Sequence, residues 1–424
     1  MSRIAALSSQ APLMAIPEAR PPAGGVGEWY RGAGGLRLRL GFWMPDGLAK
    51  GTVFVSPGRT EPIEKYYEVI GDILSRGFAV VAHDWRGQGL SARLMPDRLK
   101  GHARSESEYL DDFQRLLDAF EDRAPKPWLM IGHSMGAALN LATLVRGETR
   151  ISGAMFVNPM LRVKTGRHSL WAVTFRTDWK VRHGLASDYV PDLFDDPFEH
   201  TFEHDALTHD ERRYNLWREQ LFACPHLGIG SPTWGWLHFA LKLGETLIRD
   251  KAKLAKKVKT PVTIICSGDD SLIMKQPSKA FTRKLPFGRY VEVPGADHEI
   301  LMELDEYRQQ FWDEFDVLTG LINEQAEEKA NAETVLTETA ALVTTEAFDS
   351  RLLEASEVSG EAGVLEIIDA EVEEIVVAEA NVPEIADVSE EVLETPETPE
   401  AYVSYELTDV PERAPEAPPE QPKA

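Results

Sequence analysis

The sequence predicts an α/β protein with a mostly parallel sheet flanked by helices. Short β-branched and apolar segments alternate with longer amphipathic ones, which is the pattern of a sheet whose strands are joined by helices. The segment 105–120 shows the helical part of this pattern, with Tyr109, Phe113, Leu116, Leu117 and Phe120 at helical spacing. Strands are expected at 36–43, 51–55, 78–83, 128–131, 151–157, 260–266 and 289–293, and helices at 61–75, 105–120, 137–144 and 301–321.

The most informative motif is Gly132-His133-Ser134-Met135-Gly136. It stands between the apolar segment 128–131 and a run of helix formers at 137–144. A G-x-S-x-G sequence between a strand and a helix is typical of a nucleophile elbow, a tight turn that presents a serine hydroxyl above the sheet edge. The alternative interpretation is an ordinary glycine-rich loop. The flanking strand and helix favour Ser134 as a nucleophile.

Two later loops contain the groups that a nucleophilic serine requires. The expected strand 260–266 ends in Ser267-Gly268-Asp269-Asp270, and the expected strand 289–293 ends in a loop that contains His298. Both loops open at the carboxyl edge of a parallel sheet, where such folds gather their ligands. His298 is the candidate base, and an aspartate behind it would hold the imidazole in one tautomer. From the residues alone, Asp269 and Asp270 both remain candidates for this acid.

Four segments together resemble a known family. They are 56–61 (SPGRTE), 84–91 (DWRGQGLS), 132–136 (GHSMG) and 295–301 (GADHEIL). Over roughly residues 28–320 the chain resembles the bacterial lysophospholipase and monoacylglycerol lipase branch of the α/β-hydrolases. The resemblance implies an α/β-hydrolase fold with the chain order serine, acid, histidine. It also implies that the acid lies in an Asp-x-x-(Val/Ile/Cys) loop, which Asp270 matches and Asp269 does not. Asp297 is next to His298 in the sequence, but neighbouring side chains usually diverge, so we expect Asp297 to make a loop or lid contact.

The resemblance further implies where an oxyanion would be stabilised. The backbone N–H of Met135 is one expected donor, and the second comes from the loop after the strand 51–55. Many relatives carry His-Gly in that loop where this chain has Pro57-Gly58. The second donor is therefore expected to be the backbone N–H of Arg59. The side chain of Arg59 either binds an anionic substrate group or lies solvated at the rim of a cleft.

The alternation of strands and helices stops between residues 161 and 250. This segment contains five of the ten tryptophans. Its position after the strand 151–157 is where the family carries a helical lid. Trp217, Trp234 and Trp236 are the candidate substrate-binding residues, as the walls of an acyl-chain pocket. The alternative is that these aromatic side chains only attach the lid to the core.

The negative charge of the chain is concentrated in a tail. Residues 325–424 contain 27 acidic and four basic residues, whereas residues 1–324 contain 42 acidic and 41 basic ones. Such a tail buries too little apolar surface to offset its ordering entropy, so we expect disorder from 323 to 424. The full expected organisation is a flexible leader (1–27), a first part of the hydrolase core (28–160), a helical lid (161–250), a second part of the core (251–322) and the acidic tail (323–424).

These observations predict a serine hydrolase that cleaves the ester of a single-acyl-chain lipid, a lysophospholipid or monoacylglycerol, without metal or cofactor. Alternatives are a general carboxylesterase, peptidase or acyltransferase on the same scaffold, or a non-catalytic binding protein that acts through its acidic tail. The expected partners are the lipid substrate, a membrane surface touched transiently by the lid, and an unknown protein for the tail; the acidic tail argues against nucleic acid. With two cysteines, no signal peptide and no apolar run long enough to span a bilayer, the expected location is cytoplasmic, with peripheral contact at the inner membrane.

Overall fold

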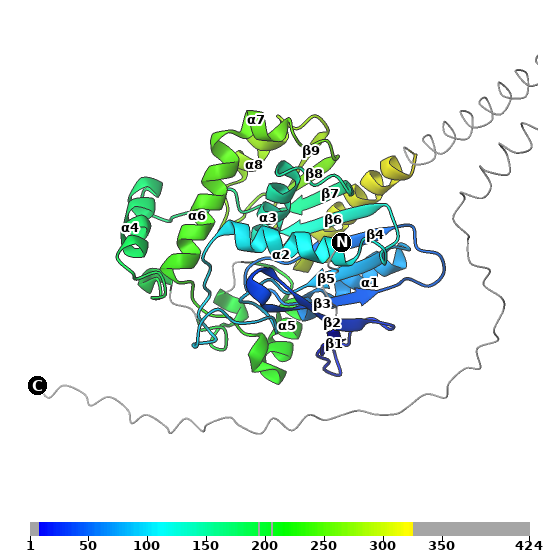
Figure 1. Ribbon diagram of the computed structural model, residues 1–424, viewed down its shortest axis with the longest axis horizontal. Helices are drawn as coiled ribbons and strands as arrows, with labels where there is room; N and C mark the ends of the chain where they lie inside the picture. The colour runs from blue at the N-terminus through cyan, green and yellow to red at the C-terminus, as the bar shows by residue number, and fades with distance from the viewer. Residues whose placement is uncertain (1–7, 194–195, 205–206, 325–424) are drawn as a thin grey trace, which may run out of the picture. The chain divides into compact units, whose positions relative to one another are not determined.

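The computed structural model describes residues 8–193, 196–204 and 207–324, and every structural statement below concerns these residues. Their strands form one sheet in the order β1-β2-β3-β5-β4-β6-β7-β8-β9 (Figure 1). The neighbours from β5 to β9 are parallel, and β1, β2 and β3 are antiparallel to their neighbours. The strands are β1 (Ser8–Gln10), β2 (Val26–Arg31), β3 (Arg37–Trp43), β4 (Thr52–Ser56), β5 (Ala79–His83), β6 (Trp128–His133), β7 (Ile151–Val157), β8 (Val262–Ser267) and β9 (Gly288–Val293).

Helices cover both faces of this sheet. The central strand β6 is buried along its whole length, and its side chains alternate between two apolar clusters. Met130 packs with α2, α3 and α8 on one face, whereas Ile131 packs with α1 and the helix 305–324 on the other. The helices are α1 (Tyr67–Ser75), α2 (Glu106–Ala119), α3 (Ser134–Val145), α4 (Leu170–Arg182), α5 (Glu211–Ala223), α6 (Trp234–Arg249), α7 (Lys251–Ala255), α8 (Lys275–Thr282) and the unlabelled yellow helix 305–324 of Figure 1.

The predicted α/β architecture is therefore confirmed, and the parallel order explains how the site is assembled. Parallel strands end at the same edge of a sheet, and β4, β6, β7, β8 and β9 are consecutive parallel neighbours. The loops that follow these strands are thus brought side by side, although they come from residues far apart in the sequence. This edge carries the predicted site residues.

Residues 8–27 differ from the flexible leader that we expected over 1–27. β1 pairs with β2, and the backbone N–H of Met14 donates to Glu64 Oε1 at 3.0 Å. The hydroxyl of Tyr67 donates to the carbonyl of Met14 at 2.8 Å. Buried polar side chains of the core thus bond to backbone groups of this segment, and Leu13 and Met14 pack against two of the apolar clusters; both kinds of contact hold it on the sheet.

The segment 161–250, which we call the insert, interrupts the core between β7 and β8. It contains α4, α5 and α6, and α4 packs along α6 (Figure 1). Val190, Trp234 and Leu237 form a small apolar cluster in which Val173 and Val181 of α4 take part. The predicted disordered tail lies outside the described residues except for 323 and 324. None of the helices that the structure describes is both long and apolar enough to cross a bilayer.

We expect Arg39→Met to destabilise the fold strongly. The Arg39 side chain is fully buried and lies 2.6 Å from Glu64 and 2.7 Å from Asp84. Removing it leaves two buried carboxylates without their cation, which costs on the order of 3–5 kcal/mol. Urea denaturation followed by circular dichroism measures this loss, with Arg37→Met, an exposed position on the same strand, as the control. A decrease of less than about 1 kcal/mol in the free energy of unfolding would contradict this account of the two Arg39 ion pairs.

Candidate active site

Ser134 lies in a cramped turn between β6 and α3. Its φ of 49° is in the left-handed region, which a non-glycine residue rarely adopts. A Cβ added at Gly132 would lie 2.7 Å from the Cα of Ala137, and one at Gly136 would lie 2.3 Å from the carbonyl oxygen of Ser56. Both glycines are therefore required by close backbone approach. The geometry is that of the predicted nucleophile elbow.

His298 contacts Asp270, whereas Asp269 is exposed. The distance from His298 Nδ1 to Asp270 Oδ2 is 2.7 Å, and both side chains are buried. Asp270 Oδ1 accepts the backbone N–H groups of Leu272 at 2.7 Å and Ile273 at 2.8 Å. Burial alone would raise the pKa of Asp270, but the hydrogen bonds from His298 and these two amides lower it below its ordinary value. Asp270 is thus held as a carboxylate behind the histidine.

The backbone of His298 is held in place by residues that the sequence analysis did not identify. Its carbonyl accepts from Asn158 Nδ2 at 2.7 Å and from His133 Nε2 at 3.1 Å. Asn158 follows β7 with a φ of 44° and also donates to the hydroxyl of Ser267 at 2.7 Å. The signal available in the sequence was its position: Asn158 is the first residue after a strand of the parallel sheet, at the same edge as the other loops.

The loop after β4 lies against the elbow, as the oxyanion prediction requires. A Cβ on Gly136 would touch the carbonyls of both Ser56 and Pro57, so this loop begins beside the first turn of α3. Met135 is in that first turn, where backbone N–H groups have no partner within the helix. The Arg59 side chain donates to the carbonyl of Gly230, and its guanidinium lies 5.0 Å from the ring centre of Trp236. It is therefore engaged with the insert, which neither alternative for this side chain anticipated.

A buried charged cluster underlies the elbow and was also missed. Glu61 Oε1 lies 2.9 Å from His133 Nδ1, and Glu61 Oε2 accepts the hydroxyl of Tyr66 at 2.6 Å and the backbone N–H of Gly58. Lys65 Nζ lies 2.5 Å from Glu299 Oε1. Burial opposes the charge of His133, but Glu61 raises the pKa of His133 above its ordinary value.

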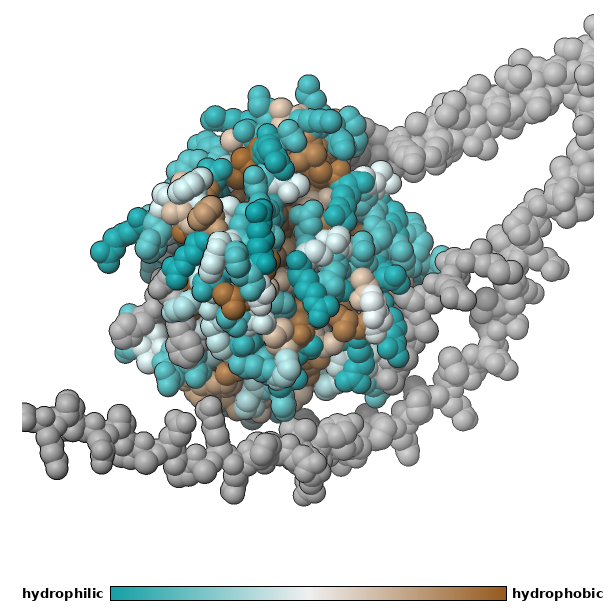
Figure 2. Space-filling model, turned by 60° about the vertical axis from the view of Figure 1, so that its left-hand side comes forward, coloured by the Kyte–Doolittle hydropathy of each residue, from teal (hydrophilic) through white to brown (hydrophobic). Residues whose placement is uncertain are grey.

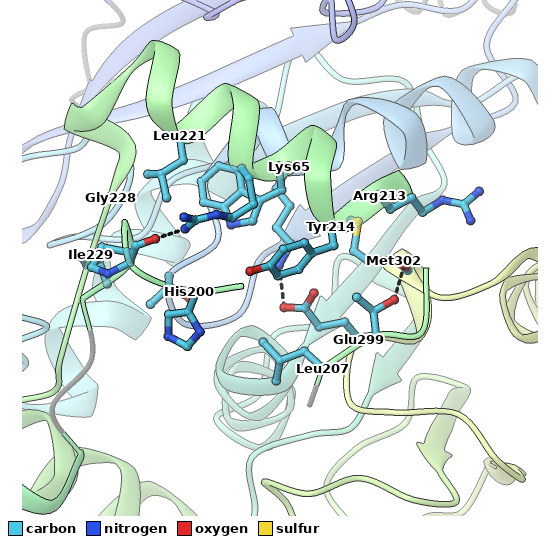
Figure 3. Close-up of a pocket in the computed structure, with 15 residues that line it drawn as sticks. Lys65, His200, Leu207, Arg213, Tyr214, Leu221, Gly228, Ile229, Glu299 and Met302 are labelled. Atoms are coloured by element: carbon cyan, nitrogen blue, oxygen red, sulfur yellow. Dashed lines mark hydrogen bonds and ion pairs between the residues drawn. The ribbon is translucent and has the colours of Figure 1, made fainter. Parts of the chain in front are cut away.

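Ser134, His298 and Arg59 line one cavity of about 870 Å³. Among the candidate substrate-binding residues, Trp234 and Trp236 line this cavity, whereas Trp217 lines a smaller one of about 120 Å³. In the smaller cavity, Lys65 and Glu299 point toward each other beside His200 and Leu207 (Figure 3). The two cavities share Thr60, His200, Leu207 and Glu299. Apolar residues of the larger one include Met160, Val163, Val190, Trp234, Leu237 and Ile273.

Only one group of side chains in the described part of the chain has the ligand spacing of a metal site. His209, Asp297 and Glu303 have their potential ligand atoms within 4.8 Å of one another. His209 Nδ1 is already 2.7 Å from Glu303 Oε1, and the carboxylate accepts further backbone N–H groups. We assign no metal to this cluster. Asp297, for which a loop or lid contact was expected, here faces His209 of the insert.

The family model of serine aminopeptidase, S33, matches residues 47–305, more than half of the chain. The match includes the elbow, Asp270 and His298. The chain therefore belongs to this family of α/β hydrolases. This confirms the superfamily and the fold class that the resemblance in the sequence implied.

Particular relatives lie in the lysophospholipase and monoglyceride lipase branch. Lysophospholipase L2 of Escherichia coli (strain K12) is 28% identical over 266 residues, which cover 60% of this chain and 76% of that protein. Monoglyceride lipase of Mus musculus is 28% identical over 131 residues, or 30% of this chain and 41% of that one. A soluble variant of monoglyceride lipase from Saccharomyces cerevisiae, solved with a substrate analog, has a TM-score of 0.55 at 18% identity and covers 68% of this chain and 93% of its own; it shows the fold.

We expect Gly136→Ala to disrupt the elbow. The new Cβ would lie 2.3 Å from the carbonyl oxygen of Ser56 and 2.5 Å from that of Pro57, so backbone has to move. Overpacking of this kind costs about 1–3 kcal/mol. The matched control is Gly71→Ala on α1, where a Cβ meets nothing within 4 Å and the helix gains stability. Thermal unfolding of both variants checks the expectation. A melting temperature of Gly136→Ala equal to that of the wild type would contradict it.

Proposed function

We propose that this protein is a serine hydrolase that cleaves the carboxylic ester of a lipid with one acyl chain, such as a lysophospholipid or a monoacylglycerol. One observation carries the proposal: Ser134 and the buried His298–Asp270 pair meet at a cavity of about 870 Å³ with many apolar side chains in its wall. That volume is within the range of about 300–1,000 Å³ typical of sites for one small ligand. The names of the relatives, lysophospholipase and monoglyceride lipase, support this substrate class.

The proposed reaction proceeds through an acyl-enzyme. Ser134 Oγ attacks the ester carbonyl while His298 Nε2 accepts its proton, and Asp270 stabilises the imidazolium. The backbone N–H groups of Met135 and Arg59 hold the negative charge that develops on the carbonyl oxygen. His298 then gives the proton to the leaving alcohol. In the second half, His298 activates a water that attacks the acyl-serine and releases the fatty acid.

The alternatives differ in the second half of the reaction or in the substrate. A general carboxylesterase would not depend on a long acyl chain, a peptidase would cleave aminoacyl arylamides, and an acyltransferase would pass the acyl group to an alcohol. A binding protein acting through the acidic tail would not react at Ser134. Labelling with a fluorophosphonate probe separates that last class from the enzymes, and a panel of esters and arylamides separates the enzymes from one another.

We also propose that the insert approaches lipid surfaces through α4. One face of α4 lies on α6 and lines the cavity, as Val173 and Arg176 do. On another face Trp171, Phe175 and Trp179 follow one another at intervals of four residues, with 75%, 61% and 46% of their surface exposed. Figure 2, which brings the left-hand side of Figure 1 forward, shows apolar surface between hydrophilic side chains on this side. We call these three residues the aromatic ridge.

The charge near the aromatic ridge suits an anionic lipid surface. The segment 164–183 contains five basic residues and one acidic residue. Each basic residue near an anionic membrane contributes about 1 kcal/mol of attraction, and aromatic rings are favoured at the level of the headgroups. The ridge lies on the same helix as part of the cavity wall, so docking would place the cavity next to the lipid.

We expect the triad variants to differ in a defined order. Ser134→Ala and His298→Ala should lose most of the catalysis, up to roughly 10⁶-fold in kcat, because triad members act as a unit. Asp270→Asn should lose on the order of 10⁴-fold, since an amide holds the wrong tautomer of the histidine. Asp269→Asn is the matched control and should retain activity. Hydrolysis of a short nitrophenyl ester measures all four, and near-normal turnover by Ser134→Ala would end the proposal.

Replacing the aromatic ridge should reduce hydrolysis of a substrate in vesicles without reducing hydrolysis of a soluble ester. We expect the triple variant Trp171→Ser/Phe175→Ser/Trp179→Ser to lose at least about tenfold in kcat/KM on a monoacylglycerol in anionic vesicles, because burying one large apolar side chain contributes about 1.5–3 kcal/mol. Hydrolysis of a soluble nitrophenyl ester should be unchanged. Phe287→Ser, which removes an exposed aromatic residue outside the insert, is the control. Equal losses on both substrates would argue that the ridge only stabilises the fold.

A further inference from the structure

Glu303 is a fully buried carboxylate five residues after His298. Its Oε1 accepts the backbone N–H of Asp297 at 2.8 Å and lies 2.7 Å from His209 Nδ1. Its Oε2 accepts the backbone N–H groups of His209 at 3.0 Å and Leu304 at 3.0 Å. One side chain therefore binds the loop of the catalytic histidine and the insert at the same time.

Hydrogen bonds hold the backbone groups of the residues before and after His298. Glu303 holds the N–H of Asp297, and the hydroxyl of Ser267 donates to the carbonyl of Asp297 at 2.5 Å. The N–H of Glu299 donates to the carbonyl of Leu207, which belongs to the insert, at 2.8 Å. The peptide units next to His298 are thus held by β8 and by the insert.

The contacts on the side of the insert converge on the same loop. The hydroxyl of Thr208 donates to the carbonyl of Met302 at 2.8 Å, and Arg213 Nη1 of α5 donates to the carbonyl of Glu303 at 2.8 Å. Together with the two contacts of His209, they bind residues 207–213 to residues 299–304. A shift of the insert is therefore transmitted to the loop that carries the catalytic base.

His209 makes this junction sensitive to protons. Its side chain is 48% exposed, so it exchanges protons with solvent, and Nε2 lies 3.4 Å from Asp297 Oδ2. The charged groups that face it are Glu303 and Asp297 from the loop after β9 and Asp269 from the loop after β8, and the ring of Tyr307 lies 6.2 Å away. The hydrogen bond to Glu303 is the largest influence, and it raises the pKa of His209 above its ordinary value.

We propose that Glu303 is a positioning residue that holds the His298 loop against the insert, and that protonated His209 acts as a latch at this junction. The inference rests on the proposed serine hydrolase function. Because the raised pKa favours the charged form in the folded protein, the contribution of the latch is fully present at low pH. It is lost as pH rises through the pKa of the folded state.

The test compares pH profiles of kcat for a soluble nitrophenyl ester between pH 5 and 9. In His209→Gln, kcat should fall about two- to fivefold at slightly acidic pH and equal that of the wild type at pH 9, since a half-exposed ion pair contributes little more. The alkaline decline that the wild type owes to the latch should disappear. In Glu303→Gln, kcat should fall about ten- to a hundredfold, the size expected for a misplaced base, while KM changes little.

Two control variants and one independent readout make the test specific. His183→Gln removes another exposed histidine of the insert, and Glu306→Gln removes a neighbouring carboxylate outside the junction; both should keep the profile of the wild type. Hydrogen exchange of the peptide 296–304 reports the junction without any catalysis. It should be faster in His209→Gln than in the wild type at pH 6, and equal at pH 9.

The outcomes distinguish this inference from the proposed function. If the wild type neither hydrolyses an ester nor labels with a fluorophosphonate, the proposed function fails, and hydrogen exchange still reports whether the latch exists. If the wild type is active but His209→Gln matches it in both pH profile and exchange, the latch is overturned. Should Glu303→Gln not fold, the profile of His209→Gln alone decides, because that side chain is half-exposed and the backbone N–H of residue 209 still donates to Glu303.

Discussion

The buried contact between Glu61 and His133 holds three separate parts of the site in one arrangement. Glu61 accepts the N–H of Gly58 in the loop after β4, and His133 is the residue before Ser134 in the elbow. His133 Nε2 faces the carbonyl of His298 and therefore donates to it, while Nδ1 faces the Glu61 carboxylate and donates there. An imidazole that donates from both nitrogens is a cation. The ion pair thus connects the loop after β4, the elbow and the loop that contains His298.

Burial strengthens the attraction between Glu61 and His133, but it also imposes a desolvation cost on both charges. Desolvation disfavours the charge of both partners, yet His133 lowers the pKa of Glu61 and Glu61 raises the pKa of His133. Loss of either partner would leave a buried charge without compensation, which is the costly case for buried ion pairs. Lys65 and Glu299 continue the cluster toward the smaller cavity, so the charges under the elbow compensate one another locally.

Backbone strain is concentrated at the same edge of the sheet. Among the described residues, the non-glycine positions with positive φ are Thr60, Ser134 and Asn158, and they follow β4, β6 and β7. Each such conformation costs on the order of 1–3 kcal/mol and persists only where its surroundings hold it. Here Thr60 N donates to Gln88 Oε1 at 3.2 Å, and Asn158 is bonded on both sides of its amide. The strained turn presents the side chain of Ser134 as the proposed chemistry requires, and the strained Asn158 holds the His298 loop through its carbonyl.

Features that depend on residues close together in the sequence could be predicted from it. Glycine sterics predict the elbow at Ser134, and strand ends in a parallel sheet predict that the Asp269-Asp270 loop and the His298 loop lie at the same edge. The choice of Asp270 over Asp269 comes only from the family resemblance. Glu61 and Glu303 could not be found in this way, because their roles depend on contacts with residues 72 and 94 positions away along the chain. Asn158 does stand at a strand end, but its bond to the carbonyl of His298, 140 positions away, is not visible in the sequence. The order of residues 8–27 could not be predicted for a related reason: hydrogen bonds to distant buried side chains and the packing of Leu13 and Met14 hold them on the sheet. Composition alone groups Trp217 with Trp234 and Trp236, but it does not indicate which cavity a side chain lines.

The insert lines the cavity and also contacts two of the loops that carry the proposed catalytic groups. Arg59, whose N–H is the proposed oxyanion donor, reaches the insert through the carbonyl of Gly230 and the ring of Trp236. Glu303 connects His209 of the insert to the loop that contains His298. The same segment therefore touches the loop after β4 and the loop that contains His298. An acyl chain that packs against Trp234 and Trp236 would restrict the motion of the insert. Through the contacts of Arg59 and Glu303 it would also restrict the groups proposed to stabilise the transition state. Binding energy from a non-reacting part of the substrate can contribute to catalysis in this way.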